Sequence, residues 1–345
     1  MAVTAHRPLI RGELPGPRAS ALIERDRRVM SPSFTRGYPF VMESGQGCWV
    51  TDVDGNVFLD FTSGIAVTAT GHCHPAVVEA IGDQARRFVH MSGTDFYYRV
   101  EIELAERLAA AIMPGGARAF FTNSGAESIE GAMKLARHST GRPHFLAFLG
   151  AFHGRTFGAL SLTASKAGQR DGFAPLLPGV FHADYPSPAR GISTDQAMAR
   201  IDRMLQTVVP PESVAAVFVE PIQGEGGYIV PPADFLPRLR ELTRRHGMLL
   251  VLDEVQSGMG RTGRMSAFEH SGVEPDVVCL AKGIASGLPL GAFVARGELM
   301  SWGPGTHGNT FGGNPIACAA GIATLDLLEG GLIENAATVG AVLRV

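Results

Sequence analysis

Short apolar runs that alternate with helical segments constrain the fold of this chain most strongly. Helical periodicity covers residues 75–88 and 100–112 and returns near the end of the chain, at 314–330. Strand-length runs separated by such helices need crossover connections, so they predict a mostly parallel, doubly wound α/β sheet flanked by helices. The runs are residues 117–121, 144–149, 215–220, 248–253, 276–281 and 291–295.

The composition favours a globular protein that acts on a small molecule. Of the 345 residues 45% are hydrophobic, and the 43 glycines and 22 prolines stay below the share typical of low-complexity chains. The formal net charge is −3 without a run of Lys or Arg, so we expect no nucleic-acid partner. The apolar runs are too short to span a membrane and no signal peptide precedes them, so we expect a cytoplasmic protein without membrane contact.

The N-terminal part has a different pattern and offers no metal site. Residues 1–33 have little apolar periodicity and are predicted to form an arm. Residues 48–61 alternate around the pair Asp-Gly at 54–55, which predicts a hairpin. Its acidic residues do not have the spacing of a calcium loop. The segment GHCHP holds His72 and His74, too few ligands for a metal, and is predicted to be a structural turn.

The residues that follow the predicted strands are the candidate site residues. In a parallel α/β sheet these positions gather at one edge, where ligands bind. After the run 117–121, Ser124, Gly125 and Ala126 open a helix whose free N–H groups can hold an anion. A helix cap formed by Asn123 or Ser124 is the simpler interpretation of the same residues.

Two further loops add aromatic, basic and acidic side chains. The loop GAFHGR carries Phe152, His153 and Arg155. Phe152 would also suit a core position, and Arg155 would also suit a solvated position. The loop EPIQGEGG carries Glu220 and Glu225 among glycines that let the backbone approach a ligand closely.

An acid and a lysine end two of the apolar strands. Asp253 follows the run MLLVL and Lys282 follows DVVCLA, where an unpaired charge is costly, so a partner is implied. The only other lysines, Lys134 and Lys166, fit solvated positions in a helix and a polar loop. Desolvation beside a strand would lower the pKa of the Lys282 amine and favour its use as a nucleophile.

An anion site, an aromatic ring, an acid and a lysine together favour pyridoxal phosphate as the cofactor. The phosphate would lie at the helix N-terminus, Phe152 would stack on the ring, Asp253 would hold the proton of the pyridine nitrogen, and Lys282 would bind the cofactor covalently. The competing motif GMGRTG at 258–263 does not fit a nicotinamide site, because its first glycine is not at a strand end and no apolar helix follows.

The same residues belong to a longer pattern that resembles the class III pyridoxal-phosphate aminotransferases of fold type I, which include 4-aminobutyrate, ornithine and acetylornithine aminotransferases. The resemblance runs from about residue 37 to residue 328 and includes the motifs DVDGNVFLDFTSGIAV, TNSGAESIEGAMKLAR, FHGRT, EPIQGEGG and NTFGGNP, and the whole stretch 251–292. It implies an N-terminal arm at 1–33, the N-terminal part of a small domain at 34–70, a large cofactor domain at 71–325, and at 326–345 the start of a C-terminal small domain that continues beyond this sequence.

The resemblance also implies roles for individual residues. Lys282 and Asp253 would be catalytic, and Gln256 would contact the ring 3-hydroxyl. Thr310 would reach the phosphate in the neighbouring subunit of a homodimer, or of a tetramer built from it, with the active site at the interface. Cofactor contacts are further implied for Ser124, Gly125, Ala126, Phe152 and His153, and substrate contacts for Arg155, Ile65, Glu225 and Glu220.

Among these substrate residues, Arg155 would grip a carboxylate with its planar guanidinium. Ile65 would form an apolar wall, and in relatives the residue matching Glu225 pairs with an arginine from the C-terminal region, which this sequence does not include.

We therefore expect an aminotransferase most like 4-aminobutyrate aminotransferase, which moves an amino group from an ω-amino acid to 2-oxoglutarate. Acetylornithine or ornithine aminotransferase is the first alternative, and an amino-acid racemase or aminomutase of the same fold is the next. An inactive truncated chain that only dimerises is the non-enzymatic alternative. No metal is expected.

Overall fold

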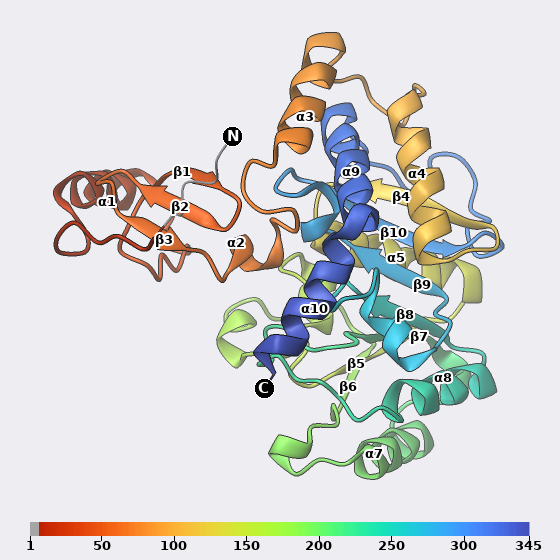
Figure 1. Ribbon diagram of the computed structural model, residues 1–345. Coiled ribbons are helices and arrows are strands. Elements are labelled where there is room, and N and C mark those ends of the chain that lie inside the picture. The colour runs from red at the N-terminus through yellow and green to blue at the C-terminus, as the bar shows by residue number, and fades with distance from the viewer. Residues whose placement is uncertain (1–6, 345) are drawn as a thin grey trace.

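A seven-stranded sheet forms the centre of the computed structural model, which describes residues 7–344 (Figure 1). The strand order is β4-β10-β9-β8-β7-β5-β6. Neighbouring strands from β9 to β6 are parallel, and β10 is antiparallel to both β9 and β4. This arrangement confirms the predicted mostly parallel sheet. Its strands are β4 (Ala117–Thr122), β5 (His144–Phe148), β6 (Val180–Ala183), β7 (Val214–Val219), β8 (Leu249–Asp253), β9 (Val277–Leu280) and β10 (Gly291–Arg296).

Six of these strands coincide with the six apolar runs, whereas β6 was not predicted. Its sequence VFHA is short and includes a histidine, and three of its four residues are only half buried at the edge of the sheet. An edge strand is buried less than a central one, so its sequence lacks the continuous apolar run that marks the other strands.

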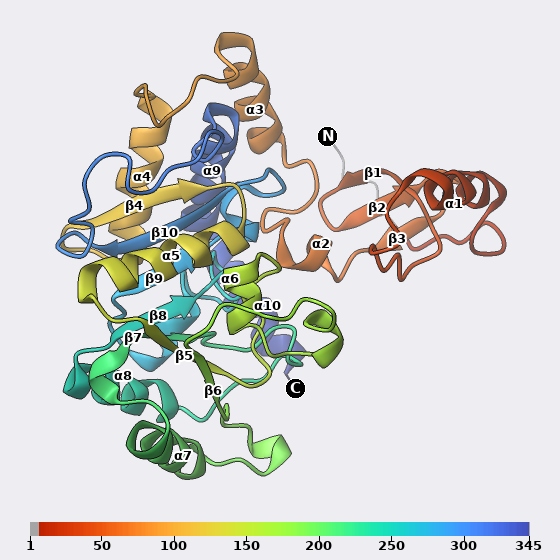
Figure 2. The same ribbon diagram turned by 180° about the vertical axis from the view of Figure 1, so that it is seen from behind.

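Helices cover both faces of the sheet, as comparison of Figures 1 and 2 shows. Successive strand residues point to opposite faces, so Leu250 and Leu252 of β8 enter one core cluster while Leu249 and Val251 enter the other. The first cluster holds α4 (Arg99–Ile112), α7 (Thr194–Thr207), α8 (Phe235–His246) and α9 (Pro315–Leu327), and the second holds α5 (Gly125–Thr140) and α6 (Phe157–Leu162).

Local capping signals fix the ends of α5, the helix whose start faces the sheet edge. The Oγ of Ser124 accepts a hydrogen bond from the Glu127 N–H, which confirms the predicted cap. Gly141 ends the helix in the left-handed conformation, with φ of 69°. The first turn of α5 is therefore held in place by the chain's own side chains before any ligand binds.

The apolar helical stretch at the C-terminal end is a core element. By length and composition alone, Pro315–Leu343 is a candidate membrane span, contrary to the expectation that no apolar run is long enough. In the structure α9 packs between α3 (Pro75–Arg87) and α4 (Figure 1), and Ala317, Cys318 and Leu325 are buried there. The stretch continues into α10 (Ile333–Leu343). Packing against this protein's own helices thus explains the apolar character of α9, whereas α10 has no buried residue.

The N-terminal residues form a separate three-stranded sheet that projects from the main body (Figure 1). Strands β2 (Trp49–Asp52) and β3 (Val57–Leu59) form the predicted hairpin, and β1 (Met42–Gln46) adds to β2. The segment expected to be an arm contains helix α1 (Pro17–Val29), and its residues 1–6 lie outside the described residues. Both carboxylate oxygens of Asp54 accept N–H groups at the start of α1, so the hairpin turn caps this helix.

Two motifs that resembled ligand sites have structural roles. His74 accepts the Ala76 N–H at the start of α3, and His72 bonds Asp60 at 2.7 Å, so GHCHP forms the expected turn. Gly260 and Gly263 of GMGRTG lie against the C-terminal helices, where a Cβ on Gly263 would approach Ala337 to 2.8 Å. The motif is followed by turns and a 3-10 helix (Ala267–Ser271) rather than by an α-helix, which agrees with the rejection of a nicotinamide site.

A buried ion pair under the sheet gives a testable stability prediction. Asp276, 2% exposed, accepts two bonds from Arg240 at 2.6 and 3.1 Å and one from the Leu250 N–H at 2.7 Å. Replacement of Asp276 by alanine leaves Arg240 buried without its partner, and we expect a loss of about 3–5 kcal/mol in the free energy of unfolding. Urea denaturation measures this loss in the free energy of unfolding. Glu274→Ala, which breaks only an exposed pair with Arg244, should cost below about 1 kcal/mol; equal losses would contradict the account.

Candidate active site

A cavity of about 450 Å³ lies at the carboxyl ends of the parallel strands. Its walls come from the loops that follow β4, β5, β7, β8 and β9, as the topology predicted. Predicted site residues make up most of the lining, namely Ser124, Gly125, Ala126, Phe152, His153, Arg155, Glu220, Glu225, Asp253, Gln256 and Lys282. The structure therefore brings together eleven of the thirteen candidates.

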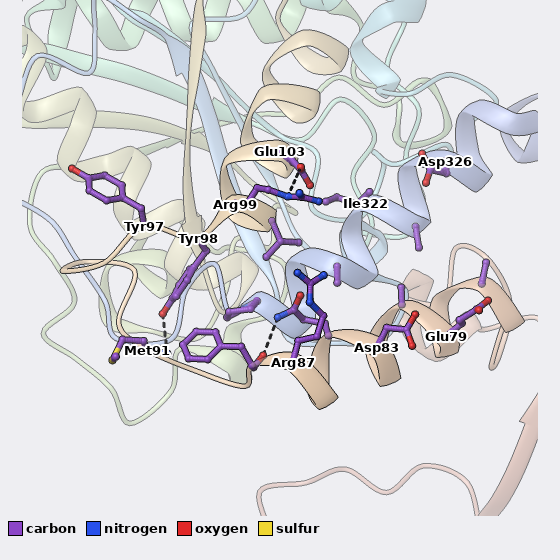
Figure 3. A pocket seen from close by; sticks show the side chains of 18 of the residues that line it. Glu79, Asp83, Arg87, Met91, Tyr97, Tyr98, Arg99, Glu103, Ile322 and Asp326 are labelled. Atoms are coloured by element: carbon purple, nitrogen blue, oxygen red, sulfur yellow. Dashed lines mark hydrogen bonds and ion pairs between the residues drawn. The ribbon is translucent and has the colours of Figure 1, made fainter.

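A larger hollow of about 810 Å³ lies elsewhere, between α3, α4 and α9 (Figure 3). Its wall carries the exposed ring of Tyr97, and Tyr98 turns its hydroxyl to accept the Met91 N–H. The residues that line it come from helices and their connections, and none is a candidate from the strand ends. The smaller cavity is therefore the candidate active site.

The start of α5 provides backbone N–H groups at one wall of the cavity. Ser124 uses its Oγ for the Glu127 N–H, while the Gly125 and Ala126 N–H groups face no acceptor within residues 7–344. Gly125 packs so closely on Val255 that a Cβ there would approach it to 2.7 Å. The cap and the anion site are thus both present, and the helix dipole favours a negative group at this point.

Asp253 is held by a buried histidine that the sequence did not link to it. The Nδ1–H of His153 donates to the Asp253 carboxylate at 2.7 Å, and the Val255 N–H donates to its other oxygen at 3.0 Å. Both side chains are almost fully buried. Burial alone would lower the pKa of His153, but the bond and the charge of Asp253 outweigh it and raise the pKa. The pair thus presents a fixed carboxylate to the cavity.

Lys282 follows β9 in a tight turn and has a left-handed backbone, with φ of 46°. This conformation strains the backbone of a non-glycine residue, and such strained residues are common at functional sites. Burial lowers the pKa of the Lys282 amine, and the nearby carboxylates of Asp253, Glu220 and Glu225 oppose this only in part. The amine is thereby favoured in its neutral, nucleophilic form.

The two glutamates of the glycine-rich loop differ in their environments. Glu220 is buried, and its two carboxylate oxygens accept the Phe152 and Gly224 N–H groups. Glu225 is partly exposed and lies 4.0 Å from the ammonium of Lys166. Glu225 is therefore the one with a side chain open to a ligand.

Arg155 lies over the aromatic ring of its own loop. Its Cζ is 5.6 Å from the centroid of Phe152, and within residues 7–344 no carboxylate pairs with its guanidinium. A positive φ of 134° at Gly154, where a Cβ would approach Ala126 to 2.7 Å, turns the loop between these two residues. An unpaired guanidinium at a cavity wall suits a carboxylate ligand.

Two of the thirteen candidates lie outside the cavity wall. Ile65 is 61% exposed in a left-handed turn, and its neighbour Val67 lines the cavity instead. Thr310 is exposed in the loop before α9 and is not part of the wall. The topology rule could not find Val67, because it comes from the N-terminal segment and follows no strand of the main sheet.

The residues present fit pyridoxal phosphate. The free N–H groups of Gly125 and Ala126 suit its phosphate, the Asp253 carboxylate suits a protonated ring nitrogen, and the Lys282 amine, whose pKa burial lowers, suits its aldehyde. His153 supports Asp253 through its Nδ1, and its Nε2 is buried without a hydrogen-bond partner within residues 7–344.

Comparison with known proteins agrees with this geometry. The family model described as aminotransferase class-III matches residues 32–345. The chain belongs to the class-III aminotransferases. These enzymes depend on pyridoxal phosphate, so the predicted cofactor and the fold type I α/β architecture are confirmed. The bound cofactor supplies an electron sink for the reacting carbon.

Individual relatives of this class-III aminotransferase differ in their activities. The acetylornithine aminotransferase of Methanopyrus kandleri is 47% identical over 87% of this chain and 73% of its own length. The alanine/serine racemase of Pyrococcus horikoshii is 40% identical over 94% of this chain and 72% of its own. The solved taurine:2-oxoglutarate aminotransferase of Bifidobacterium kashiwanohense, in complex with pyridoxal phosphate and glutamate, superposes with a TM-score of 0.88 at 31% identity, covering 96% of this chain and 77% of that one.

Proposed function

We propose that this class-III aminotransferase transfers the terminal amino group of an ω-amino acid of the acetylornithine type to 2-oxoglutarate. The position of Arg155 carries the proposal, because an unpaired guanidinium shares one cavity with the Lys282 amine. An ω-amino acid has an amine at one end and a carboxylate at the other, which matches these two groups.

Similarity to an acetylornithine aminotransferase at 47% identity supports the choice of donor. The solved relative that is named for 2-oxoglutarate supports the choice of acceptor. The donor 4-aminobutyrate has the same two end groups and is the second candidate, although no relative reported above carries that name.

In the proposed reaction the protein's own residues position and move protons. The backbone of Gly125 and Ala126 anchors the phosphate, and Asp253, fixed by His153, keeps the ring nitrogen protonated. The Lys282 amine takes the proton from the reacting carbon, since burial lowers its pKa toward the neutral form. Arg155 and Glu225 orient the two substrates in turn. Thr310 acts in the partner's site of a cytoplasmic homodimer.

Arg155→Ala should separate substrate binding from the chemical step. Arg155 is exposed in this chain, and a bound donor would cover its guanidinium. Loss of the covered charged pair costs roughly 2–5 kcal/mol, so kcat/KM for carboxylate-bearing donors should fall by about 30- to 4,000-fold. Simple amines without a carboxylate should react as before. Steady-state kinetics with both donor types measure the difference, and equal losses for both would assign Arg155 a structural role only.

A donor panel tests the proposed function directly. The protein loaded with pyridoxal phosphate is incubated with acetylornithine, ornithine or 4-aminobutyrate and 2-oxoglutarate, and glutamate is measured. The highest kcat/KM is expected for acetylornithine. A preference for 4-aminobutyrate would replace the proposed donor by the second candidate. Epimerisation of alanine or serine without glutamate would indicate a racemase, and no turnover in a cofactor-bound dimer would indicate the inactive alternative.

A further inference from the structure

Two loops of the active site are held together by one buried carboxylate. Glu220 ends the strand β7 and is 5% exposed. Its Oε2 accepts the Phe152 N–H at 3.1 Å from the loop after β5, and its Oε1 accepts the Gly224 N–H at 3.2 Å from its own glycine-rich loop. A single side chain therefore fixes the backbone of the loop that carries Phe152 and Arg155 and of the loop that carries Glu225.

Further contacts hold the loop after β5 against the glycine-rich loop after β7. Gln223, fully buried, donates its Nε2–H to the Leu149 carbonyl at 3.0 Å. Gly150 and Gly226 approach so closely that a Cβ on Gly226 would lie 2.6 Å from the Gly150 carbonyl oxygen. The hydroxyl of Tyr185 donates to the Glu220 carbonyl at 3.0 Å and so holds the backbone of Glu220 in place.

We propose that Glu220 is a positioning residue that joins the ring-stacking loop 150–155 to the substrate loop 221–227. It does so through its own carboxylate and does not contact the substrate. This inference rests on the proposed function for the roles of Phe152, Arg155 and Glu225, and it assigns Glu220 a task other than the substrate contact that the resemblance implied. Each of its oxygens already accepts one backbone N–H group, from Phe152 and from Gly224.

Burial and the neighbouring groups together set the pKa of Glu220. The pKa is raised to about 7, mainly by burial and also by the charge of Asp253, while the charge of His153 and the hydrogen bonds from the Gly224 and Phe152 N–H groups oppose the rise. The charge of Glu220 in turn acts to raise the pKa of Lys282 and that of Tyr185. The carboxylate form of Glu220 accepts both N–H groups, whereas the protonated acid presents its own O–H toward one of them. The link between loops 150–155 and 221–227 is therefore strongest above about pH 7.

Amide hydrogen exchange tests the proposal without reference to any substrate. In the full chain loaded with pyridoxal phosphate, Glu220→Gln should speed exchange of at least one of the Phe152 and Gly224 amides by about 10- to 100-fold at pH 8.5, because the neutral amide keeps one acceptor oxygen and presents an NH2 donor where the other oxygen was. After correction for intrinsic rates, the wild-type protection should weaken below pH 7, and the variant should show no such pH dependence.

Glu254→Gln is the matched control. Glu254 is an equally buried carboxylate that accepts the Phe268 N–H at 2.8 Å, and burial raises its pKa to about 7 as well. Its variant should speed exchange at Phe268 and leave Phe152 and Gly224 protected. Unchanged exchange at those two amides in Glu220→Gln would overturn the proposal. Because exchange does not depend on the donor, failure of the donor panel and failure of this inference are separate results.

Discussion

Replacing Lys282 with alanine should reduce amino-group transfer by about 10⁴-fold or more, because the chain loses both its nucleophile and its proton carrier at the reacting carbon. Lys282 is the lysine that the fold places in the cavity, with a backbone φ of 46° and a pKa lowered by burial. Glutamate formation by the purified variant, supplied with excess pyridoxal phosphate, measures the loss.

Lys134→Arg is the control for this variant. Lys134 is exposed, and its ammonium donates to the Thr306 carbonyl and to His307 far from the cavity wall. Its substitution by arginine keeps a cation there and should leave turnover close to that of the wild type. Comparable turnover in Lys282→Ala would contradict the assignment.

Asp253→Asn should retain the cofactor but reduce kcat by about 10²- to 10³-fold, since a neutral amide cannot keep the ring nitrogen protonated. The bond from His153 to Asp253, 2.7 Å long between two buried side chains, holds the carboxylate in place, and the isosteric amide preserves the shape. Cofactor content from absorbance and kcat from glutamate formation separate binding from chemistry. Near-normal kcat would show that Asp253 is not the partner of the ring nitrogen.

Much of the cavity could be predicted from the sequence because of a single topological rule. Parallel strands end at one edge, so Ser124, Phe152, Glu220, Asp253 and Lys282 had to meet there once the apolar runs were assigned to strands. The rule depends only on strand order and direction, both of which follow from alternating strands and helices.

Contacts between loops could not be predicted from the sequence. His153 and Asp253 are 100 positions apart, and nothing in either loop shows that the imidazole turns toward the acid rather than toward a ligand. The same holds for Glu220, whose two oxygens accept the Phe152 and Gly224 N–H groups of two different loops.

Elements that depend on the small N-terminal sheet were also hard to predict. Helix α1 has weak apolar periodicity because only Ala19 is buried, and its start is capped from a distance by Asp54. Val67 reaches the cavity from this region, whereas the neighbouring Ile65 is exposed in a strained left-handed turn. Sequence spacing alone does not show which of two nearby apolar residues points inward.

Reduction of the loaded protein with borohydride, followed by peptide mapping, tests the central claim most directly, because it fixes the cofactor on the residue that binds it. The account predicts pyridoxyl label on the peptide containing Lys282, and no label in Lys282→Ala. Label on Lys134 or Lys166, or label on the Lys282→Ala protein equal to that on the wild type, would contradict it.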